Sequence, residues 1–326
     1  MNMQKVSWGI IGVGDVCELK SAPAMQLIKG SEIAAVMRRN GTKAQDYAKR
    51  HNICRWYDNA DALIADPNVN AIYIATPPHV HCEYTLKAAA AKKPVYVEKP
   101  MANSRDDCLK MIKACREASV PLFCAYYRRT LPHFLKVKAL LEEGAIGTIR
   151  HVEIRLCKPS EPELIANMDE PWRVNPEIGK GGYFADLASH QLDALDFLLG
   201  PIARAKGVSD NLAGKYQAPD IVCANWQFES GVTGVGSWCF SASSNSDREE
   251  TIIVGSKGEI RYPSFGKGEV ELIRNSNHEV FQFDLPKHIQ QPLIKQVVSA
   301  LLGQGKCVST GDSAMRTNQV LEWILA

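Results

Sequence analysis

The sequence contains no apolar run of about 18 residues or more, the length that crosses a bilayer as a helix. It also lacks an excess of charge of one sign, because its 326 residues carry a formal net charge of only +2. A net charge this small does not imply a nucleic-acid partner or an anionic membrane. The N-terminal apolar part is short and runs into a glycine turn, so we expect no signal peptide there. We therefore expect a cytoplasmic protein without nucleic-acid or membrane partners.

Closely spaced cysteines are absent as well, although the chain has 10 cysteines. No two of them form a Cys-x-x-Cys pair, and the nearest approach to a metal motif is the His-Val-His-Cys segment 79–82. Zinc sites need tighter Cys/His clusters, so we expect no metal site. Cys124, Cys223 and Cys239 lie within apolar runs, which predicts buried free thiols in a reducing compartment.

The first third of the chain alternates short apolar runs with helical stretches. Strands are predicted at 6–13, 32–37, 70–75, 94–98 and 120–127, and helices at 41–51, 81–93 and 104–119, the last with Ser104 as its N-cap. Alternating βαβ units predict a parallel sheet with helices on both faces. Residues 1–124 are therefore expected to form a dinucleotide-binding domain of the Rossmann type.

The rest of the chain has a different pattern. Segment 147–156 alternates apolar and polar residues with period two, as a half-exposed antiparallel strand does. Further strands are predicted at 220–228, 232–240, 250–256 and 258–263, and helices at 181–200, 289–302 and 312–325. Residues 125–326 are thus expected to form an α+β domain with a large, mostly antiparallel open sheet, whose C-terminal helices could pack back towards the first domain.

A glycine loop follows the first predicted strand. It reads Gly12-Val13-Gly14-Asp15-Val16-Cys17, a G-x-G-x-x-C variant of the dinucleotide fingerprint. Gly12 permits the tight turn, Gly14 lets the backbone approach a pyrophosphate, and Cys17 is small enough for close packing of helix on strand. The loop and the helix N-terminus behind it predict a cofactor site at Gly12, Val13, Gly14, Asp15 and Val16.

The second strand ends in two arginines, Arg38 and Arg39, where NAD-binding domains carry an acidic residue for the ribose. Two guanidinium groups suit a 2′-phosphate, which they can bind with paired hydrogen bonds. This favours NADP over NAD as the cofactor. The alternative is a solvated strand end in which one arginine only stacks on the adenine.

Helix 181–200 carries two stripes. Ala188, Leu192, Leu195 and Leu199 share one face, and Asp186, His190 and Asp193 lie at i, i+4 and i+7 on another. The polar stripe is either a solvated face or a catalytic pair. Histidine has the pKa range that suits proton exchange, and a carboxylate one turn earlier can orient the ring.

Four motifs, in the order they occur, resemble those of the Gfo/Idh/MocA oxidoreductases (glucose–fructose oxidoreductase, inositol dehydrogenase and rhizopine-catabolism proteins). They are ATPPHVH at 75–81, VYVEKPMA at 95–102, YYRR at 126–129 and WRVNPEIGKGGYFADLASHQLD at 172–193. The resemblance covers almost the whole chain and departs from the pattern at Cys17, where the third glycine is expected. It implies a Rossmann domain, a second domain whose open sheet often forms an oligomer interface, and hydride transfer between NAD(P) and a sugar or polyol.

The resemblance also implies roles for individual residues. Lys99, Asp186 and His190 would be catalytic, with His190 exchanging the proton and Lys99 stabilising the reacting oxygen. Contacts to the cofactor are implied for Thr76, Pro77, His81, Glu98 and Lys99 besides the glycines, and a cis peptide bond is implied before Pro100. Tyr127, Arg128, Trp172 and Arg173 are expected to line the substrate cleft, whereas Asp193 either joins them or belongs to a structural network.

The sequence therefore predicts an NADP-dependent dehydrogenase that acts on the hydroxyl-bearing carbon of a sugar, polyol or cyclic diol. One alternative is an NADPH-dependent reductase of a dicarbonyl sugar or a dihydrodiol dehydrogenase. An alternative of another class is a catalytically silent NADP-binding regulator, against which the intact set of Lys99, Asp186 and His190 argues. A homodimer or homotetramer through the C-terminal sheet is expected.

Overall fold

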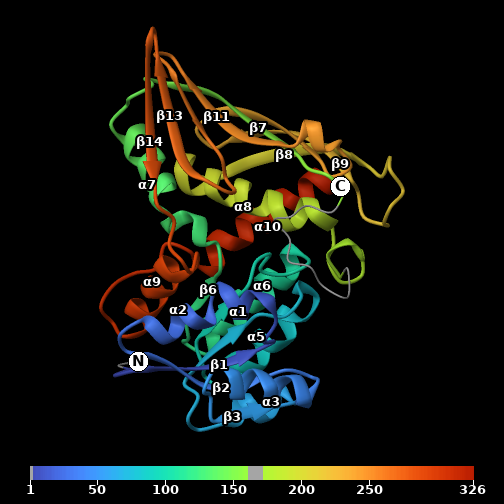
Figure 1. The fold of residues 1–326 in the computed structure, drawn as a ribbon, viewed down its shortest axis with the longest axis vertical. Coiled ribbons are helices and arrows are strands. Elements are labelled where there is room, and N and C mark those ends of the chain that lie inside the picture. Colours follow the sequence, from blue (N-terminus) through green and yellow to red (C-terminus); the bar gives the residue numbers. More distant parts are fainter. Residues whose placement is uncertain (1–2, 161–171) are drawn as a thin grey trace. The chain divides into compact units, whose positions relative to one another are not determined.

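The computed structural model describes residues 3–160 and 172–326, which belong to two compact units (Figure 1). Unit 1 comprises Met1–Tyr127 and Pro286–Met315, and unit 2 comprises Arg128–Leu285 and Arg316–Ala326. The chain first passes from unit 1 to unit 2 after Tyr127, three residues after the boundary expected at 124/125. A segment from the C-terminal part of the chain, 286–315, belongs to unit 1.

Unit 1 is built on a six-stranded sheet of order β3-β2-β1-β4-β5-β6, in which every pairing is parallel. Its strands are β1 (Val6–Ile11), β2 (Ser31–Met37), β3 (Arg55–Tyr57), β4 (Ala71–Ile74), β5 (Val95–Val97) and β6 (Leu122–Cys124). Its helices are α1 (Asp15–Leu19), α2 (Ala22–Leu27), α3 (Gly41–Arg50), α4 (Ala60–Ala65), α5 (His81–Ala90), α6 (Arg105–Glu117), α9 (Gln291–Leu301) and the start of α10 (Gly311–Leu325). The predicted Rossmann-type sheet is confirmed.

The first residues of α3 and α6 follow from capping residues in the local sequence. The Asn40 side chain accepts a hydrogen bond from Lys43 N at 3.0 Å and starts α3. The predicted N-cap Ser104 starts α6, because its hydroxyl accepts from Asp107 N at 3.1 Å. Each cap satisfies a backbone donor that has no partner within its own helix. The expected helix after the glycine loop is instead two short ones, α1 and α2, with Lys20 and Ser21 between them.

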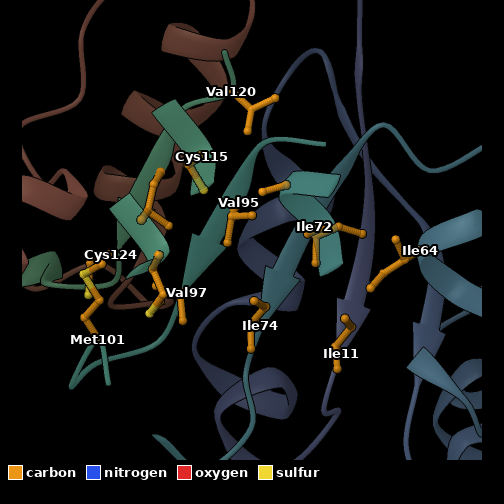
Figure 2. Close-up of a cluster of buried hydrophobic side chains, with 14 of the residues drawn as sticks. Ile11, Ile64, Ile72, Ile74, Val95, Val97, Met101, Cys115, Val120 and Cys124 are labelled. Atoms are coloured by element: carbon orange, nitrogen blue, oxygen red, sulfur yellow. The ribbon is translucent and has the colours of Figure 1, made fainter. Parts of the chain in front are cut away.

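The core of unit 1 packs helices against the apolar strands (Figure 2). Ile11, Ile72, Ile74, Val95 and Val97 point from β1, β4 and β5 into one cluster. The buried thiols of Cys108, Cys115 and Cys124 complete it. Strands that are apolar on both faces, as β4 is, are typical of a parallel sheet covered on both sides.

The prediction that the cysteines in apolar runs are buried is wrong for Cys223, which is exposed. Cys223 lies on β9 between Val222 and Ala224, and these two neighbours are buried. Side chains alternate along a strand, so only every second residue of this run faces the core. Cys239 is half-buried for the same reason, since it follows the buried Trp238 at the end of β10.

Unit 2 contains an eight-stranded sheet of order β14-β13-β12-β11-β7-β10-β9-β8. Its strands are β7 (Ile149–Cys157), β8 (Ile202–Asp210), β9 (Ile221–Phe228), β10 (Thr233–Cys239), β11 (Arg248–Gly255), β12 (Glu259–Tyr262), β13 (Gly268–Arg274) and β14 (Asn277–Phe283). Of the pairings in this sheet of described residues, only β7–β10 is parallel, so the predicted mostly antiparallel open sheet is confirmed. Helices α7 (Pro132–Glu142) and α8 (Gly182–Leu199) lie along it (Figure 1).

Helix α8 is buried on nearly all sides, which overturns the solvated-face interpretation of its polar stripe. His190 is 4% exposed and Asp193 has no exposed surface. The helix begins at Gly182, and both Gly182 and its N-cap Gly181 have left-handed backbone, at φ 61° and φ 87°. A Cβ on Gly182 would lie 2.6 Å from the Cβ of Ala218, so the Gly-Gly pair lets the helix start in tight packing.

A buried histidine on α7 predicts a loss of stability in acid. His133 is 2% exposed, and burial, helped by the charge of Arg128, lowers its pKa to about 4. The unfolded chain binds this proton near pH 6.5, so between about pH 6.5 and 4 the unfolded state holds more protons than the folded one. Stability therefore falls as the pH falls through this window, by about 3 kcal/mol at most from this residue.

Denaturant unfolding of wild type and His133→Gln across this pH range measures the effect. The variant should lose less stability than wild type between neutral pH and pH 4. Equal losses in the two proteins would show that His133 does not carry the dependence.

Candidate active site

The glycine loop joins the end of β1 to α1 and is fixed by the neighbouring strand. Gly12 N and Val13 N donate to Met37 O at the end of β2, at 2.9 and 3.3 Å. Gly12 has φ 96°, and a Cβ there would lie 2.7 Å from Thr76 Cγ2 and 2.9 Å from Ala75 O. Only glycine fits this position.

Gly14 differs from Gly12, because a Cβ built on it would meet nothing within 4 Å. Its backbone is extended and it is the N-cap of α1, which begins at Asp15. A glycine that packing does not require, beside open space at a helix start, fits the close approach of a pyrophosphate. The residues present therefore fit a dinucleotide at this loop.

Cys17 has the packing role expected of the third glycine. Its side chain is fully buried and its Sγ donates to Gly12 O at 3.7 Å. Burial raises the pKa of the thiol to about 12, so it stays protonated. Cysteine at position 17, where the fingerprint has its third glycine, thus still packs against the glycine loop and bonds to Gly12.

Basic side chains gather beside this loop. Arg38 Nη1 donates to Val13 O at 3.2 Å, which places its guanidinium on the glycine loop itself. Arg39 is exposed, and partial burial together with the charge of Arg39 lowers the pKa of His79. Arg39 follows β2 and His79 follows β4, the two strands that flank β1 in the parallel sheet, so both residues lie at the sheet edge that carries the glycine loop, within electrostatic range of each other. Arg38, Arg39 and His79 therefore form a basic group, which no sequence motif identifies as one group.

His81 ties two loops of unit 1 together. Its Nε2 faces Thr76 O at 2.7 Å, and its Nδ1 faces Pro100 O at 3.1 Å and Met101 O at 3.2 Å. Burial lowers the pKa of His81 to about 4, so the ring is neutral at physiological pH and donates from one of its two nitrogens at a time. The ring is fully buried between these loops, and its contact with the cofactor stays a prediction.

Lys99 follows β5 at the carboxyl end of the sheet, the edge at which open α/β sheets bind ligands. It is half-buried, and its peptide bond to Pro100 is cis, as the resemblance implies. Its backbone N donates to Glu98 Oε2 at 3.2 Å. Thr76 and Pro77, at the end of the neighbouring β4, are half-buried. The segments after β1, β4 and β5, including the starts of α1 and α5, therefore carry all the cofactor residues expected in unit 1 apart from Arg38 and Arg39.

In unit 2, Asp186 on α8 forms an ion pair with Arg173. Arg173 Nε donates to Asp186 Oδ2 at 3.0 Å, and the guanidinium stacks on the Trp172 ring at 4.5 Å. Arg173 and Trp172 were expected to contact substrate, and Asp186 to orient His190. The ion pair also gives Arg173 a positioning role, because Arg173 holds the Asp186 carboxylate one turn before His190.

Phe265 packs on His190 and is missing from the residues that sequence motifs single out. The two rings meet edge to face, with centroids 6.2 Å apart. The Arg128 guanidinium lies 4.3 Å from the centre of the Phe265 ring, and Arg128 Nε donates to Ser264 O at 2.7 Å. Arg128 therefore holds the loop that contains Ser264 and Phe265, and its place in the substrate cleft stays a prediction.

Glu249 holds the same loop from the side of β11. Its Oε1 accepts from Ser264 N at 2.8 Å and its Oε2 accepts from Phe265 N at 3.1 Å. Gln191, next to His190 on α8, donates to Glu249 Oε1 at 3.1 Å. Burial raises the pKa of Glu249 above its usual value. No local motif marks Phe265 or Glu249, because their role comes from contacts between distant strands and α8.

Asp193 lies in a buried charge network rather than at the surface. Arg129 donates from Nη2 to Asp193 Oδ1 at 2.7 Å and from Nε to Asp193 Oδ2 at 2.8 Å. Arg129 also reaches Asp196 at 3.1 Å, and Arg316 of α10 donates to Asp196 at 2.7 Å. Of the two roles considered for Asp193, the contacts favour the structural network. Tyr127, in the same 3-10 turn (Tyr127–Thr130) as Arg129, is buried.

Two features are absent from the residues that the structure describes. Over 3–160 and 172–326, no group of three or more His, Cys, Asp or Glu side chains could hold a metal ion. Within the same ranges, no helix has both the length and the apolar character needed to cross a membrane.

Both units match known proteins. Residues 6–126 match the family model "Oxidoreductase family, NAD-binding Rossmann fold", and residues 134–261 match "GFO/IDH/MocA C-terminal domain". The chain is 35% identical over 318 residues to Oxidoreductase P35 of Formosa agariphila, with 98% of each protein covered. It is 30% identical over 228 residues to 1,5-anhydro-D-fructose reductase of Ensifer adhaerens, over 69% of this chain and 66% of that protein.

The fold is also similar to that of a levoglucosan dehydrogenase solved with NADH and levoglucosan. The TM-score is 0.87 at 21% identity, with 99% of this chain and 96% of that chain covered. The glycine loop, the Glu98-Lys99-Pro100 strand end and α8 thus occur in a chain whose two parts match the same family in order. The protein belongs to the Gfo/Idh/MocA family of oxidoreductases and carries the family's NAD-binding Rossmann fold in residues 6–126.

Proposed function

We propose that the protein is an NADP-dependent oxidoreductase that moves a hydride reversibly between the nicotinamide and a hydroxyl-bearing carbon of a sugar, polyol or cyclic diol. The observation that carries the cofactor assignment is the place of Arg38. Its guanidinium lies on the glycine loop, 3.2 Å from Val13 O, at the end of the strand where NAD-binding domains carry an acid. A cationic group at that point favours a 2′-phosphate.

The residues that would hold the cofactor surround the loops of unit 1. Gly12, Val13, Gly14, Asp15 and Val16 would bind the pyrophosphate, and Arg38 and Arg39 the 2′-phosphate. Thr76, Pro77, Glu98 and Lys99 would lie at the nicotinamide half. A nicotinamide dinucleotide bound there supplies the hydride acceptor for oxidation and the donor for reduction.

The protein's own part is to move the proton and to stabilise the reacting oxygen. We assign the proton exchange to His190, whose ring packs edge to face with the Phe265 ring. The Lys99 ammonium would hydrogen-bond the substrate oxygen and stabilise the negative charge that develops on it. Asp186, held by Arg173, would favour the charged form of His190 during the reaction.

A carbohydrate-like substrate is supported by two of the similar proteins. One is named for the reduction of 1,5-anhydro-D-fructose, and the other was solved with levoglucosan, so both names describe an anhydrosugar. The reduction of a dicarbonyl sugar and the oxidation of a dihydrodiol use the same residues in the same roles and remain the alternative activities. The homo-oligomer through the C-terminal sheet and the cytoplasmic location stay predictions.

Turnover of NADP⁺ with aldoses, polyols and cyclic diols, and of NADPH with dicarbonyl sugars, tests the activity. The proposal predicts turnover of one of these classes by wild type and none by Lys99→Ala. Tight NADPH binding by wild type without turnover of any class would contradict it and favour the silent regulator.

Arg38 supplies a prediction on cofactor choice. Arg38→Asp should weaken NADPH binding by about 10- to 100-fold, the effect of losing a hydrogen bond between charged groups, and should favour NADH. Fluorescence titration with NADPH and NADH measures both affinities. Lys49→Asp, which makes the same charge change at an exposed position of α3, should leave the ratio unchanged. Tighter binding of NADH than of NADPH by wild type would contradict the NADP assignment.

A further inference from the structure

The carboxylate of Glu98 is held by two buried donors that are far apart in the sequence. The Tyr73 hydroxyl donates to Glu98 Oε1 at 2.6 Å, and Gln290 Nε2 donates to the same oxygen at 2.8 Å. Tyr73 has no exposed surface, Gln290 is 1% exposed and Glu98 is 8% exposed. All three belong to unit 1, although Gln290 comes from the C-terminal segment 286–315.

The orientation of the Gln290 amide is fixed by a further tyrosine. Tyr96 donates from its hydroxyl to Gln290 Oε1 at 3.3 Å, so the amide oxygen is engaged and the amide nitrogen points to Glu98. The Tyr96 ring stacks on the Tyr73 ring with centroids 5.0 Å apart. Burial raises the pKa of both tyrosines well above their usual range, so both hydroxyls stay protonated and can donate.

The two carboxylate oxygens of Glu98 are therefore not equivalent. Oε1 accepts from two side-chain donors, which is the usual capacity of one carboxylate oxygen. Oε2 accepts from Lys99 N at 3.2 Å and keeps capacity for a second donor. A carboxylate is costly to bury unless its oxygens are hydrogen-bonded, and Tyr73 and Gln290 meet that cost on one side only.

We propose that Tyr73 and Gln290 are positioning residues that aim Glu98 Oε2 at a hydroxyl group of the nicotinamide ribose. A ribose hydroxyl is a neutral donor that a fixed carboxylate oxygen can bind strongly. The C-terminal segment thus completes the nucleotide site of the N-terminal sheet through Gln290. This assignment rests on the proposed cofactor and adds residues that lie outside its contacts.

The test separates the two halves of the cofactor. Tyr73→Phe and Gln290→Met keep side-chain volume and remove the donor. Each variant is titrated with NADPH, which has the nicotinamide ribose, and with 2′,5′-ADP, which lacks it. Each should bind NADPH about ten-fold more weakly than wild type, as expected for one lost hydrogen bond to a charged group, and 2′,5′-ADP as well as wild type does.

Matched controls come from the same unit. Tyr57→Phe removes a tyrosine hydroxyl that donates to a carboxylate elsewhere, Asp66 at 3.1 Å, and Gln296→Met changes a glutamine within α9. Both controls should bind the two nucleotides as wild type does.

Two outcomes would overturn the assignment itself, and a third would refute the proposed function on which it rests. NADPH affinity unchanged in both Tyr73→Phe and Gln290→Met would show that these donors do not position Glu98. Equal weakening of NADPH and 2′,5′-ADP would indicate general damage to unit 1 instead. Failure of wild type to bind either nucleotide would instead refute the proposed function. This result is seen with wild type alone, without the variants.

Discussion

Replacement of His190 by alanine is expected to lower kcat by about 10²- to 10⁴-fold while NADPH affinity stays at the wild-type value. A general acid–base group contributes a rate factor of this size, because the alkoxide or carbonyl oxygen must exchange a proton as the hydride moves. His190 belongs to unit 2, whereas the residues expected to bind the cofactor belong to unit 1. Binding and turnover should therefore separate cleanly.

Steady-state kinetics and a pH profile measure the effect. Wild type should show a limb in kcat/KM that reports the ionisation of His190, and His190→Ala should lose that limb. His278→Ala is the matched control, because His278 is an exposed histidine of β14 that pairs with Glu271. Turnover of His190→Ala within a few-fold of wild type would remove His190 from its assigned role.

Replacement of Arg129 by methionine is expected to lower the free energy of unfolding by about 3–5 kcal/mol. Arg129 is buried with Asp193 and Asp196, and it makes paired hydrogen bonds to Asp193. Its removal leaves buried carboxylate charge with one cation fewer. Burial already raises the pKa of Asp193 to about 6, and loss of Arg129 raises this pKa further.

Denaturant unfolding of the variant measures the loss. Arg316→Met is the matched control, because Arg316 also pairs with Asp196 but its side chain is 38% exposed. Water can take the place of an exposed ion-pair partner. Arg316→Met should therefore lower the free energy of unfolding by only about 1 kcal/mol or less. If Arg129→Met and Arg316→Met lost equal stability, burial would not determine the value of these ion pairs.

The residues that the sequence identifies are those whose backbone position allows few alternatives. Gly12 must have positive φ and leaves no room for a Cβ, so its place after an apolar strand is readable from the sequence. Arg38 is readable for a related reason, since the end of the second strand lies beside the glycine loop in every sheet of this order. Periodicity also predicts ten of the strands and most of the helices, but it misses strands β3, β8, β13 and β14 and helices α4 and α7.

The partners of the site residues could not be read from the sequence. Gln290 lies 192 positions from Glu98, and only the folding of the C-terminal segment onto unit 1 brings them together. Phe265 lies in a turn between β12 and β13, and no pattern there marks it as the neighbour of His190. The polar stripe on α8 was ambiguous because periodicity gives a face but not what covers that face.

The most direct test of hydride transfer follows the hydrogen itself. Wild-type protein is given NADPH that carries deuterium on both positions of nicotinamide C4, with keto and dicarbonyl sugars as acceptors. The account predicts a reduced sugar with one deuterium on the carbon that bears the new hydroxyl group. A reduced sugar without deuterium on that carbon, or no consumption of any acceptor by protein that binds NADPH, would contradict it.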